Sequence, residues 1–165
     1  MPPLVRAATG ADLASVARIY GHTVRTGVGT FDLTDPPDDY WTAKLDSTQP
    51  GDHLLVADDA GVVIGFAYSS AFRSRPAYAQ TRETSVYLAP DAVGAGVGSA
   101  LYAELLRRLR DDGMHVAVAV IAQPNPASVA LHEKFGFELV GTLREVGRKF
   151  DRWIDTRWYQ LRLGQ

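Results

Sequence analysis

The sequence predicts an α+β fold, and three observations support this prediction. Residues 53–72 alternate as two strands about a turn, and residues 137–163 alternate in the same way, so each segment predicts an antiparallel pair. Between them the chain predicts a strand, a helix, a strand and a helix in succession, at residues 81–89, 97–112, 115–122 and 125–136. With 165 residues and no linker or internal repeat, we expect one domain over residues 1–165.

The remaining elements follow from local signals. Residues 4–9 predict a first strand, and residues 9–24 predict an amphipathic helix in which Thr9 and Asp12 have the spacing of a capping box. A second helix is expected around residues 37–47. Asp59, Ala60 and Gly61 supply the turn of the first strand pair.

Turn and cap residues also set the ends of the two rear helices. Gly113 ends the helix that carries Leu101, Leu105 and Leu109 on its inward face. The last helix starts with Asn125 as the N-cap and Pro126 at its first position, and Gly136 ends it.

Composition excludes several functional classes. The chain is 46% hydrophobic and 22% charged, and it contains no apolar stretch long enough to cross a bilayer. Its N-terminus lacks the features of a secretory signal, so we expect a cytoplasmic protein. A net charge of -2 argues against nucleic-acid binding and favours a small-molecule partner.

Cysteine and histidine content narrows the chemistry further. The chain has no cysteine, which excludes disulfides, thiolate metal sites and a covalent thiol intermediate. His22, His53 and His115 have no mutual metal-ligand spacing, so we expect no metal site.

Three glycines at alternate positions precede the helix that starts near residue 97. Gly94, Gly96 and Gly98 join an apolar strand to a helix start, where free N–H groups and the helix dipole can bind a phosphate or diphosphate. The dinucleotide fingerprint fails because Ser99 stands where its third glycine belongs, and the Gly-Lys-Ser/Thr ending of a triphosphate loop is absent. A tight turn alone accounts for the glycines equally well.

Two spaced motifs resemble the GNAT superfamily of acetyl-CoA-dependent N-acetyltransferases. The phosphate loop of that superfamily is Gln/Arg-x-x-Gly-x-Gly/Ala, and here both glycines match while valine replaces the leading Gln/Arg. This loop comprises Val93, Gly94, Ala95, Gly96, Val97 and Gly98, followed by Ser99. The second motif is an Asn that opens a helix ending in a Tyr/His-Glu-x-x-Gly-Phe/Tyr pattern, which is matched by Asn125 and by LHEKFGF at residues 131–137. The resemblance implies the GNAT fold, a central mixed and mostly antiparallel sheet flanked by helices.

Across nearly the whole chain the sequence is similar to the phosphinothricin acetyltransferase group. The stretches that carry this likeness are GTFDLTDP, AYSSAFRSRPAYAQTRETSVYLAP, GSALYAELL, VAVIAQPNPASVALHEKFGF and VGRKFDRWIDTRWYQLRL. Members of the group acetylate phosphinothricin, methionine sulfoximine or methionine sulfone with acetyl-CoA, and they form homodimers. The resemblance therefore implies an acetyl-CoA-dependent enzyme, a small amine as partner and a homodimer.

The same resemblance assigns roles to residues near the coenzyme. Glu83 is implied as the general base, and His132 as a proton donor or a polar contact near the thioester sulfur. A lone histidine on a helix is more often a packing residue, and a lone glutamate at a strand end is more often solvated. The main-chain N–H groups of Val86, Tyr87 and Leu88 are also implied as coenzyme contacts, provided that their strand separates from its neighbour as it does in relatives. The remaining implied contacts are the loop from Val93 to Ser99, Ser128 and Asn125, although Asn125 is at least as well explained as a helix cap alone.

For the acceptor, the resemblance implies a cluster ahead of Glu83. Arg73, Arg75 and Tyr78 suit a carboxylate, phosphinate or sulfoximine oxygen, although arginines of a polar loop are usually solvated. Further side chains line a small pocket, or belong to the core or a dimer contact: Phe31, Lys149, Trp153, Trp158 and Tyr159.

The leading hypothesis is direct acetyl transfer from acetyl-CoA to the α-amine of a small amino acid analogue. One alternative keeps the enzyme but changes the acceptor to a polyamine, an antibiotic amine or a protein N-terminus. The other is a non-catalytic module that binds acyl-CoA, which the missing Gln/Arg at Val93 would permit.

Overall fold

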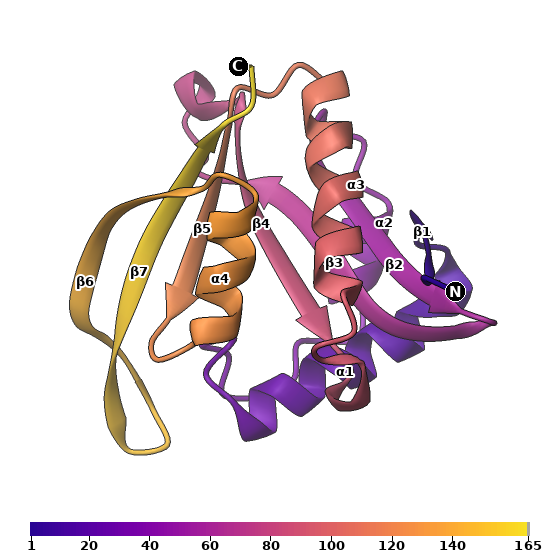
Figure 1. The fold of residues 1–165 in the computed structure, drawn as a ribbon, viewed down its shortest axis with the longest axis horizontal. Helices are drawn as coiled ribbons and strands as arrows, with labels where there is room; N and C mark the ends of the chain where they lie inside the picture. The colour runs from indigo at the N-terminus through magenta and orange to yellow at the C-terminus, as the bar shows by residue number, and fades with distance from the viewer. Residues whose placement is uncertain (165) are drawn as a thin grey trace.

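The computed structural model describes residues 1–164 and contains one seven-stranded sheet in the order β1-β2-β3-β4-β5-β7-β6 (Figure 1). The strands are β1 (Leu4–Ala7), β2 (His53–Asp59), β3 (Val62–Ala71), β4 (Thr81–Leu88), β5 (Val116–Ala122), β6 (Glu138–Lys149) and β7 (Arg152–Arg162). The helices are α1 (Leu13–Thr26), α2 (Tyr40–Leu45), α3 (Val97–Asp111) and α4 (Pro126–Lys134), with short 3-10 turns at Gly10–Asp12, Pro76–Tyr78 and Pro90–Ala92. The α+β prediction is confirmed.

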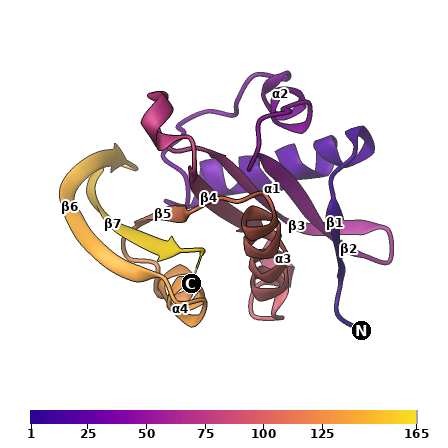
Figure 2. The same ribbon diagram turned by 90° about the horizontal axis from the view of Figure 1, so that it is seen from above.

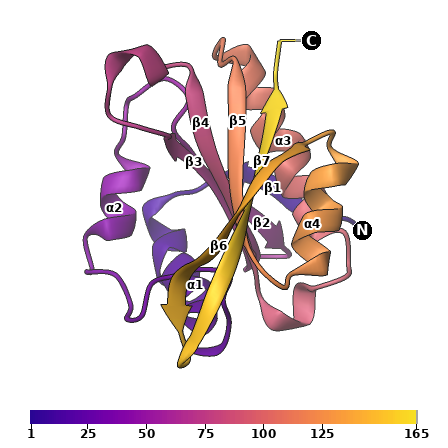
Figure 3. The same cartoon turned by 90° about the vertical axis from the view of Figure 1, so that its left-hand side faces the viewer.

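Helices cover both faces of the sheet. Figure 2 and Figure 3 show α1 and α2 on one face and α3 and α4 on the other. Every neighbouring pair of strands is antiparallel except β4 and β5, which run parallel. The parallel pair is the one whose connection contains α3, as a crossover between parallel strands requires.

The parallel strands β4 and β5 separate soon after they meet. Their pairing starts at Thr81 with Val116 and ends at Glu83 with Val118. Beyond that point β4 continues along β3 as far as Leu88, while β5 continues along β7 as far as Ala122. Figure 1 shows the resulting wedge, which opens the sheet at its centre.

The core on the α3 face comes from the periodicity of that helix. Leu101, Leu105 and Leu109 are fully buried against the sheet, as their spacing predicts, and Tyr102 is buried beside them. Since Tyr102 carries a hydroxyl into an otherwise apolar layer, that hydroxyl needs a partner inside the protein.

The core on the α1 and α2 face is aromatic. Trp41 of α2 packs edge-on against Tyr20 of α1 and against Phe66 and Tyr68 of β3, with ring centroids 5.1 to 5.8 Å apart. Tyr87 of β4 stacks on Phe66 at 5.3 Å. These rings fix α1 and α2 against β3 and against β4, which borders the wedge.

The turn and cap signals are confirmed at their predicted positions. The Thr9 N–H donates to the Asp12 carboxylate over 2.7 Å, and Asn125 Oδ1 accepts from the Ser128 N–H over 3.1 Å. Gly113 and Gly136 have φ of +75° and +87°, the left-handed conformation that ends a helix. The second helix is shorter than predicted and covers only Tyr40–Leu45.

The edge strand β6 carries an unusual amount of exposed apolar surface. Leu139, Val140, Leu143 and Val146 are all exposed along it, and the adjoining Phe150 and Trp153 are exposed as well. Long apolar edge strands invite pairing with another chain. Among residues 1–164, no helix has both the length and the apolar character needed to cross a membrane.

Candidate active site

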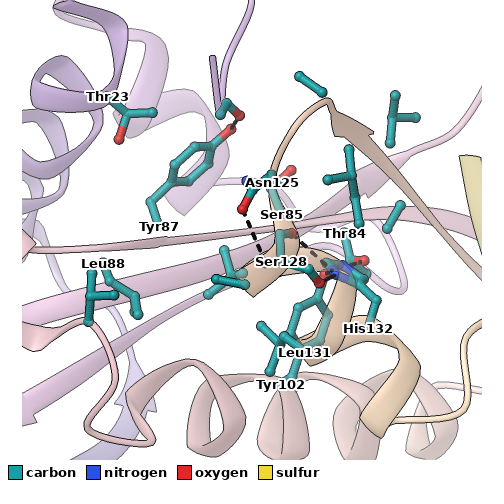
Figure 4. A pocket seen from close by; sticks show the side chains of 18 residues that line it. Thr23, Thr84, Ser85, Tyr87, Leu88, Tyr102, Asn125, Ser128, Leu131 and His132 are labelled. Carbon is teal, nitrogen blue, oxygen red and sulfur yellow. Dashed lines mark hydrogen bonds between the residues drawn. The ribbon is translucent and has the colours of Figure 1, made fainter. Parts of the chain in front are cut away.

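The wedge between β4 and β5 forms a cavity of about 320 Å³ (Figure 4). Its walls include residues from both faces of the sheet, such as Thr23 of α1 and Tyr102 of α3. The lining comprises Thr23, Gly29, Thr84, Ser85, Val86, Tyr87, Leu88, Val93, Tyr102, Ala119, Val120, Ile121, Ala122, Asn125, Ala127, Ser128, Leu131 and His132. A cavity of this size that is mostly apolar with a few polar groups is typical of a binding site.

Glu83 lies where the wedge begins. It is the last β4 residue paired with β5, directly before the cavity-lining run that starts at Thr84. Its side chain is half-buried on the α2 face, and burial raises its pKa above the usual value, while Arg73 and Lys44 act in the opposite direction. A carboxylate with a raised pKa beside a cavity is a candidate acid–base group.

The main chain of β4 presents N–H groups to the wedge. The Ala89 N–H donates to the Ile64 carbonyl over 2.9 Å, and Tyr87 stands opposite Phe66 in the same register. Since N–H groups alternate along a strand, the Val86 and Leu88 N–H groups point into the wedge. The Tyr87 N–H points to β3 instead, which corrects its expected coenzyme contact, although the Tyr87 side chain lines the cavity.

His132 lies on α4 at the inner wall of the cavity and is only 3% exposed. Its Nδ1 lies 2.7 Å from the Ser128 carbonyl oxygen, so Nδ1 carries the hydrogen, and Nε2 accepts from the Tyr102 hydroxyl over 2.6 Å. Figure 4 shows Tyr102 of α3 and His132 of α4 pointing toward one another. Burial lowers the pKa of His132, which favours the neutral ring.

The hydrogen-bonded chain continues from His132 to the β4 side of the wedge. The Tyr102 hydroxyl lies 3.0 Å from Thr84 Oγ1, and Thr84 also lines the cavity. Both ring nitrogens of His132 therefore have partners within the protein. This arrangement matches the polar-contact role expected for His132 better than the proton-donor role.

The glycine loop serves two separate purposes. Gly94 and Gly96 have φ of +83° and +80°, and a Cβ at either position would meet nothing within 4 Å, so backbone conformation rather than space selects glycine there. A Cβ at Gly98 would instead lie 3.3 Å from the Leu131 side chain. Gly98 thus allows α3 and α4 to approach closely.

The N-terminus of α3 is suited to an anion. Its first turn contains no acidic residue, and the ammonium of Lys134 lies 3.0 Å from Ser99 Oγ in that turn. A cation beside the positive end of a helix is unfavourable unless an anion joins them. The loop thus fits a phosphate group.

The acceptor cluster lies on the loop between β3 and β4. The Arg73 guanidinium stacks 4.4 Å from the Phe72 ring, and Tyr78 packs edge-on against Phe72 at 5.6 Å. Trp158 of β7 adds a further ring, 6.4 Å from Phe72. Arg75 is exposed on the same loop.

The other expected pocket residues separate into different roles. Lys149 is buried and donates to the Thr30 carbonyl over 2.8 Å. The Phe31 ring lies against Gly147. Both contacts connect the segment between α1 and α2 to the strand pair of β6 and β7. Tyr159 is buried in the core, and Trp153 is exposed.

Comparisons with known proteins decide the family. Residues 5–158 match the acetyltransferase (GNAT) domain model. The chain belongs to the GNAT family. It has the GNAT fold and is an acetyl-CoA-dependent N-acetyltransferase.

Individual GNAT relatives align over almost the full chain. A phosphinothricin N-acetyltransferase of Streptomyces coelicolor is 47% identical over 94% of both chains. An L-methionine sulfoximine/L-methionine sulfone acetyltransferase of Pseudomonas aeruginosa is 37% identical over 99% of this chain and 96% of its own. A GNAT phosphinothricin acetyltransferase of Sinorhizobium meliloti, solved in complex with acetyl-CoA, superposes with a TM-score of 0.94 at 42% identity, covering 99% of this chain and 90% of that one.

Part of the cavity lining coincides with residues expected from the sequence. The expected residues that line the cavity are Val86, Tyr87, Leu88, Val93, Asn125, Ser128 and His132. Tyr102 and the β5 wall at residues 119–122 were missed. The signal for Tyr102 was available, because it follows Gly98 by one helical turn and places a hydroxyl on an apolar helix face. The histidines show no cluster with other ligands that could hold a metal within residues 1–164.

We predict that Tyr102→Phe destabilises the protein by about 1–3 kcal/mol, because it leaves buried His132 Nε2 without its donor. Chemical denaturation of both proteins measures this difference. Tyr159→Phe is the matched control, since Tyr159 is equally buried but has no hydrogen bond from its hydroxyl among the described residues. Equal stabilities for Tyr102→Phe and the parent would contradict the hydrogen-bonded chain.

Proposed function

We propose that this enzyme transfers the acetyl group of acetyl-CoA directly to the α-amine of a small amino acid analogue such as phosphinothricin, methionine sulfoximine or methionine sulfone. The observation that carries the proposal is the place of Glu83, a half-buried carboxylate at the point where the wedge meets the cationic acceptor cluster. The names of the relatives support the substrate class.

The residues present fit the coenzyme. Gly94 and Gly96 leave open space at the α3 N-terminus, where the first-turn N–H groups and Lys134 would hold the diphosphate. The Val93 side chain cannot replace the polar contact of Gln or Arg, and Lys134 compensates for it with a charge. The Val86 and Leu88 N–H groups would hold the pantetheine arm and the acyl oxygen, and Asn125 and Ser128 lie on the opposite wall.

Glu83 would accept a proton from the acceptor's ammonium, which creates the neutral amine that acyl transfer requires. Transfer forms the bond between nitrogen and the acyl carbon and breaks the bond between that carbon and sulfur. The proton that the nitrogen then loses goes to the departing thiolate, so the products are the N-acetylated acceptor and free coenzyme A thiol. The Val86 and Leu88 N–H groups would donate hydrogen bonds to the oxyanion that forms. His132 takes the polar-contact role, because its ring nitrogens are already engaged.

Direct transfer fits the residue inventory of the wedge. The chain has no cysteine, and within residues 1–164 the hydroxyl groups that line the cavity are those of Thr23, Thr84, Ser85, Tyr87, Tyr102 and Ser128. The Thr84 and Tyr102 hydroxyls are engaged with one another. Ser128 Oγ lies 3.4 Å from His132 Nδ1, but Nδ1 has its closer contact with the Ser128 carbonyl oxygen at 2.7 Å and carries the hydrogen, so it cannot accept the proton of that hydroxyl. The Tyr102 hydroxyl, which donates to His132 Nε2, is fully buried. Neither hydroxyl is therefore arranged as an activated nucleophile.

For the acceptor, Arg73, Arg75 and Tyr78 would bind an acidic or strongly polar group at the far end of the substrate side chain. All three side chains are exposed, and the Arg73 guanidinium and the Tyr78 ring both lie against the Phe72 ring. The Phe31 ring, 38% exposed, would lie at the entrance.

We also propose that the enzyme is a homodimer. The exposed apolar side chains of β6, together with Phe150 and Trp153, form a continuous edge that a second copy of the chain would cover.

Glu83→Gln should lower kcat by a factor on the order of 10²–10⁴ while leaving the affinity for acetyl-CoA unchanged, because the amide keeps the shape but cannot accept the proton. Steady-state kinetics with acetyl-CoA and methionine sulfone, methionine sulfoximine or phosphinothricin measure the effect. In the parent enzyme kcat/KM should rise with pH through the raised pKa of Glu83, because the base must be ionised, and this acidic limb should be absent from the residual activity of the variant.

Glu138→Gln is the matched control for Glu83→Gln, since Glu138 is an exposed strand glutamate outside the wedge. An unchanged kcat for Glu83→Gln would remove the base assignment. Turnover of polyamines but of none of the three amino acid analogues would refute the acceptor class.

Leu143→Lys should convert the protein to a monomer, because it places a charge in the middle of the exposed β6 edge. Light scattering after size exclusion measures the mass of the parent and the variant. A monomeric parent at micromolar concentration would contradict the homodimer.

A further inference from the structure

Lys44 is a partly buried cation that the proposed reaction does not yet use. It lies on α2, with its ammonium 4.5 Å from the ring centroid of Tyr68 and 5.0 Å from that of Tyr40. These rings hold the lysine stem and direct the ammonium along the face of the sheet that α2 covers.

The register of the sheet places Lys44 on the same face as Glu83. Tyr68 of β3 stands opposite Ser85 of β4, and Ser70 stands opposite Glu83. Since side chains at alternate positions of a strand share a face, Tyr68, Ser85 and Glu83 project toward α2 together. The Lys44 ammonium lies over Tyr68, and the next cross-strand pair on β3 and β4 whose side chains share this face contains Glu83, the candidate base.

The charge of Lys44 has no dedicated counterion. Among residues 1–164 it forms no salt bridge. The two carboxylates that influence it are Asp52 and Glu83, and Asp52 is already paired with Arg82 at 2.9 Å and accepts from Ser47 at 2.6 Å. A partly desolvated ammonium without a close anion is unfavourable, and burial lowers the pKa of Lys44 accordingly.

Glu83 thus lies within the electrostatic influence of two cations that come from different elements. Arg73 approaches it from the loop after β3, and Lys44 approaches it from α2. An α-amino acid carries its amine and its carboxylate on one carbon, so it needs a carboxylate and a cation side by side in the site. Glu83 and Lys44 form such a pair. Arg73 then remains available to bind the polar group at the end of the substrate side chain.

We propose that Lys44 binds the α-carboxylate of the acceptor while Glu83 receives its α-amine, and that Lys44 thereby makes the site selective for amino acids over amines that lack an acid group. The proposal rests on the proposed acetylation of amino acid analogues. It assigns a specificity-determining role to α2, a helix whose sequence carries no recognised motif.

The test compares L-methionine sulfone with its primary carboxamide as acceptors for the parent enzyme and for Lys44→Met, which keeps the stem but removes the charge. We expect KM for methionine sulfone to rise about tenfold, because a charge-assisted contact is lost. KM for the carboxamide and KM for acetyl-CoA should stay within about twofold of the parent values. Lys44→Arg keeps the charge and should retain most of the preference for methionine sulfone over its carboxamide. Thermal unfolding checks that each variant is folded.

Arg18→Met is the matched control, since Arg18 is an exposed cation on the neighbouring helix α1. An equal rise in KM for both acceptors would overturn the proposal, because Lys44 would then act on Glu83 or on the fold rather than on the carboxylate. The proposal would also be overturned if Arg73→Met, but not Lys44→Met, lost the preference for methionine sulfone over its carboxamide. If the parent enzyme acetylates neither compound nor phosphinothricin, the proposed function itself fails, and the Lys44 proposal fails with it.

Discussion

The structure depends on the separation of β4 from β5 after only three paired residues. Two neighbouring parallel strands normally continue to share hydrogen bonds, and here each turns away to follow its antiparallel partner. The separation leaves the Val86 and Leu88 N–H groups without a strand to bind, in a cavity lined from both faces of the sheet. Unsatisfied backbone donors in a partly enclosed place are costly for the free protein, and a ligand with acceptor atoms relieves that cost.

The two faces of the sheet contribute different chemistry to this opening. On one face, α3 and α4 bring a helix N-terminus, a cation at Lys134 and the neutral pair of Tyr102 and His132. On the other face, α2 and the loop after β3 bring the charges of Lys44 and Arg73 near Glu83. In the proposed reaction the coenzyme is held by the first face and the acceptor by the second, so the two substrates meet only within the wedge.

Much of the fold was predictable, because its signals are local. The cap at Asn125 and the buried leucines of α3 lie where their spacing predicts them. The glycine loop was predictable as the connection that precedes α3, and its role as an anion site stays a prediction. The separate reason for Gly98, its closeness to Leu131, required the packed helices. The wedge was not predictable from residue patterns, because nothing in the β4 and β5 sequences marks where two parallel strands stop pairing.

The site was predictable only where a motif marked it. Glu83 and His132 came from a family resemblance, and their catalytic roles stay predictions. Lys44 had no signal at all, since a lysine on a short polar helix is ordinary, and its position over Tyr68 arises from tertiary packing. Likewise the alternation that turns the Tyr87 N–H toward β3 depends on register, which a single strand sequence does not specify.

Isothermal titration of coenzyme A into the parent protein and into Gly96→Val tests the central claim most directly. The account predicts saturable binding to the parent, and binding weaker by about tenfold or more for the variant, because valine cannot adopt the φ of +80° that shapes the loop. Absence of binding to the parent, or equal affinity for both proteins, would contradict the claim that the wedge and its glycine loop hold the coenzyme.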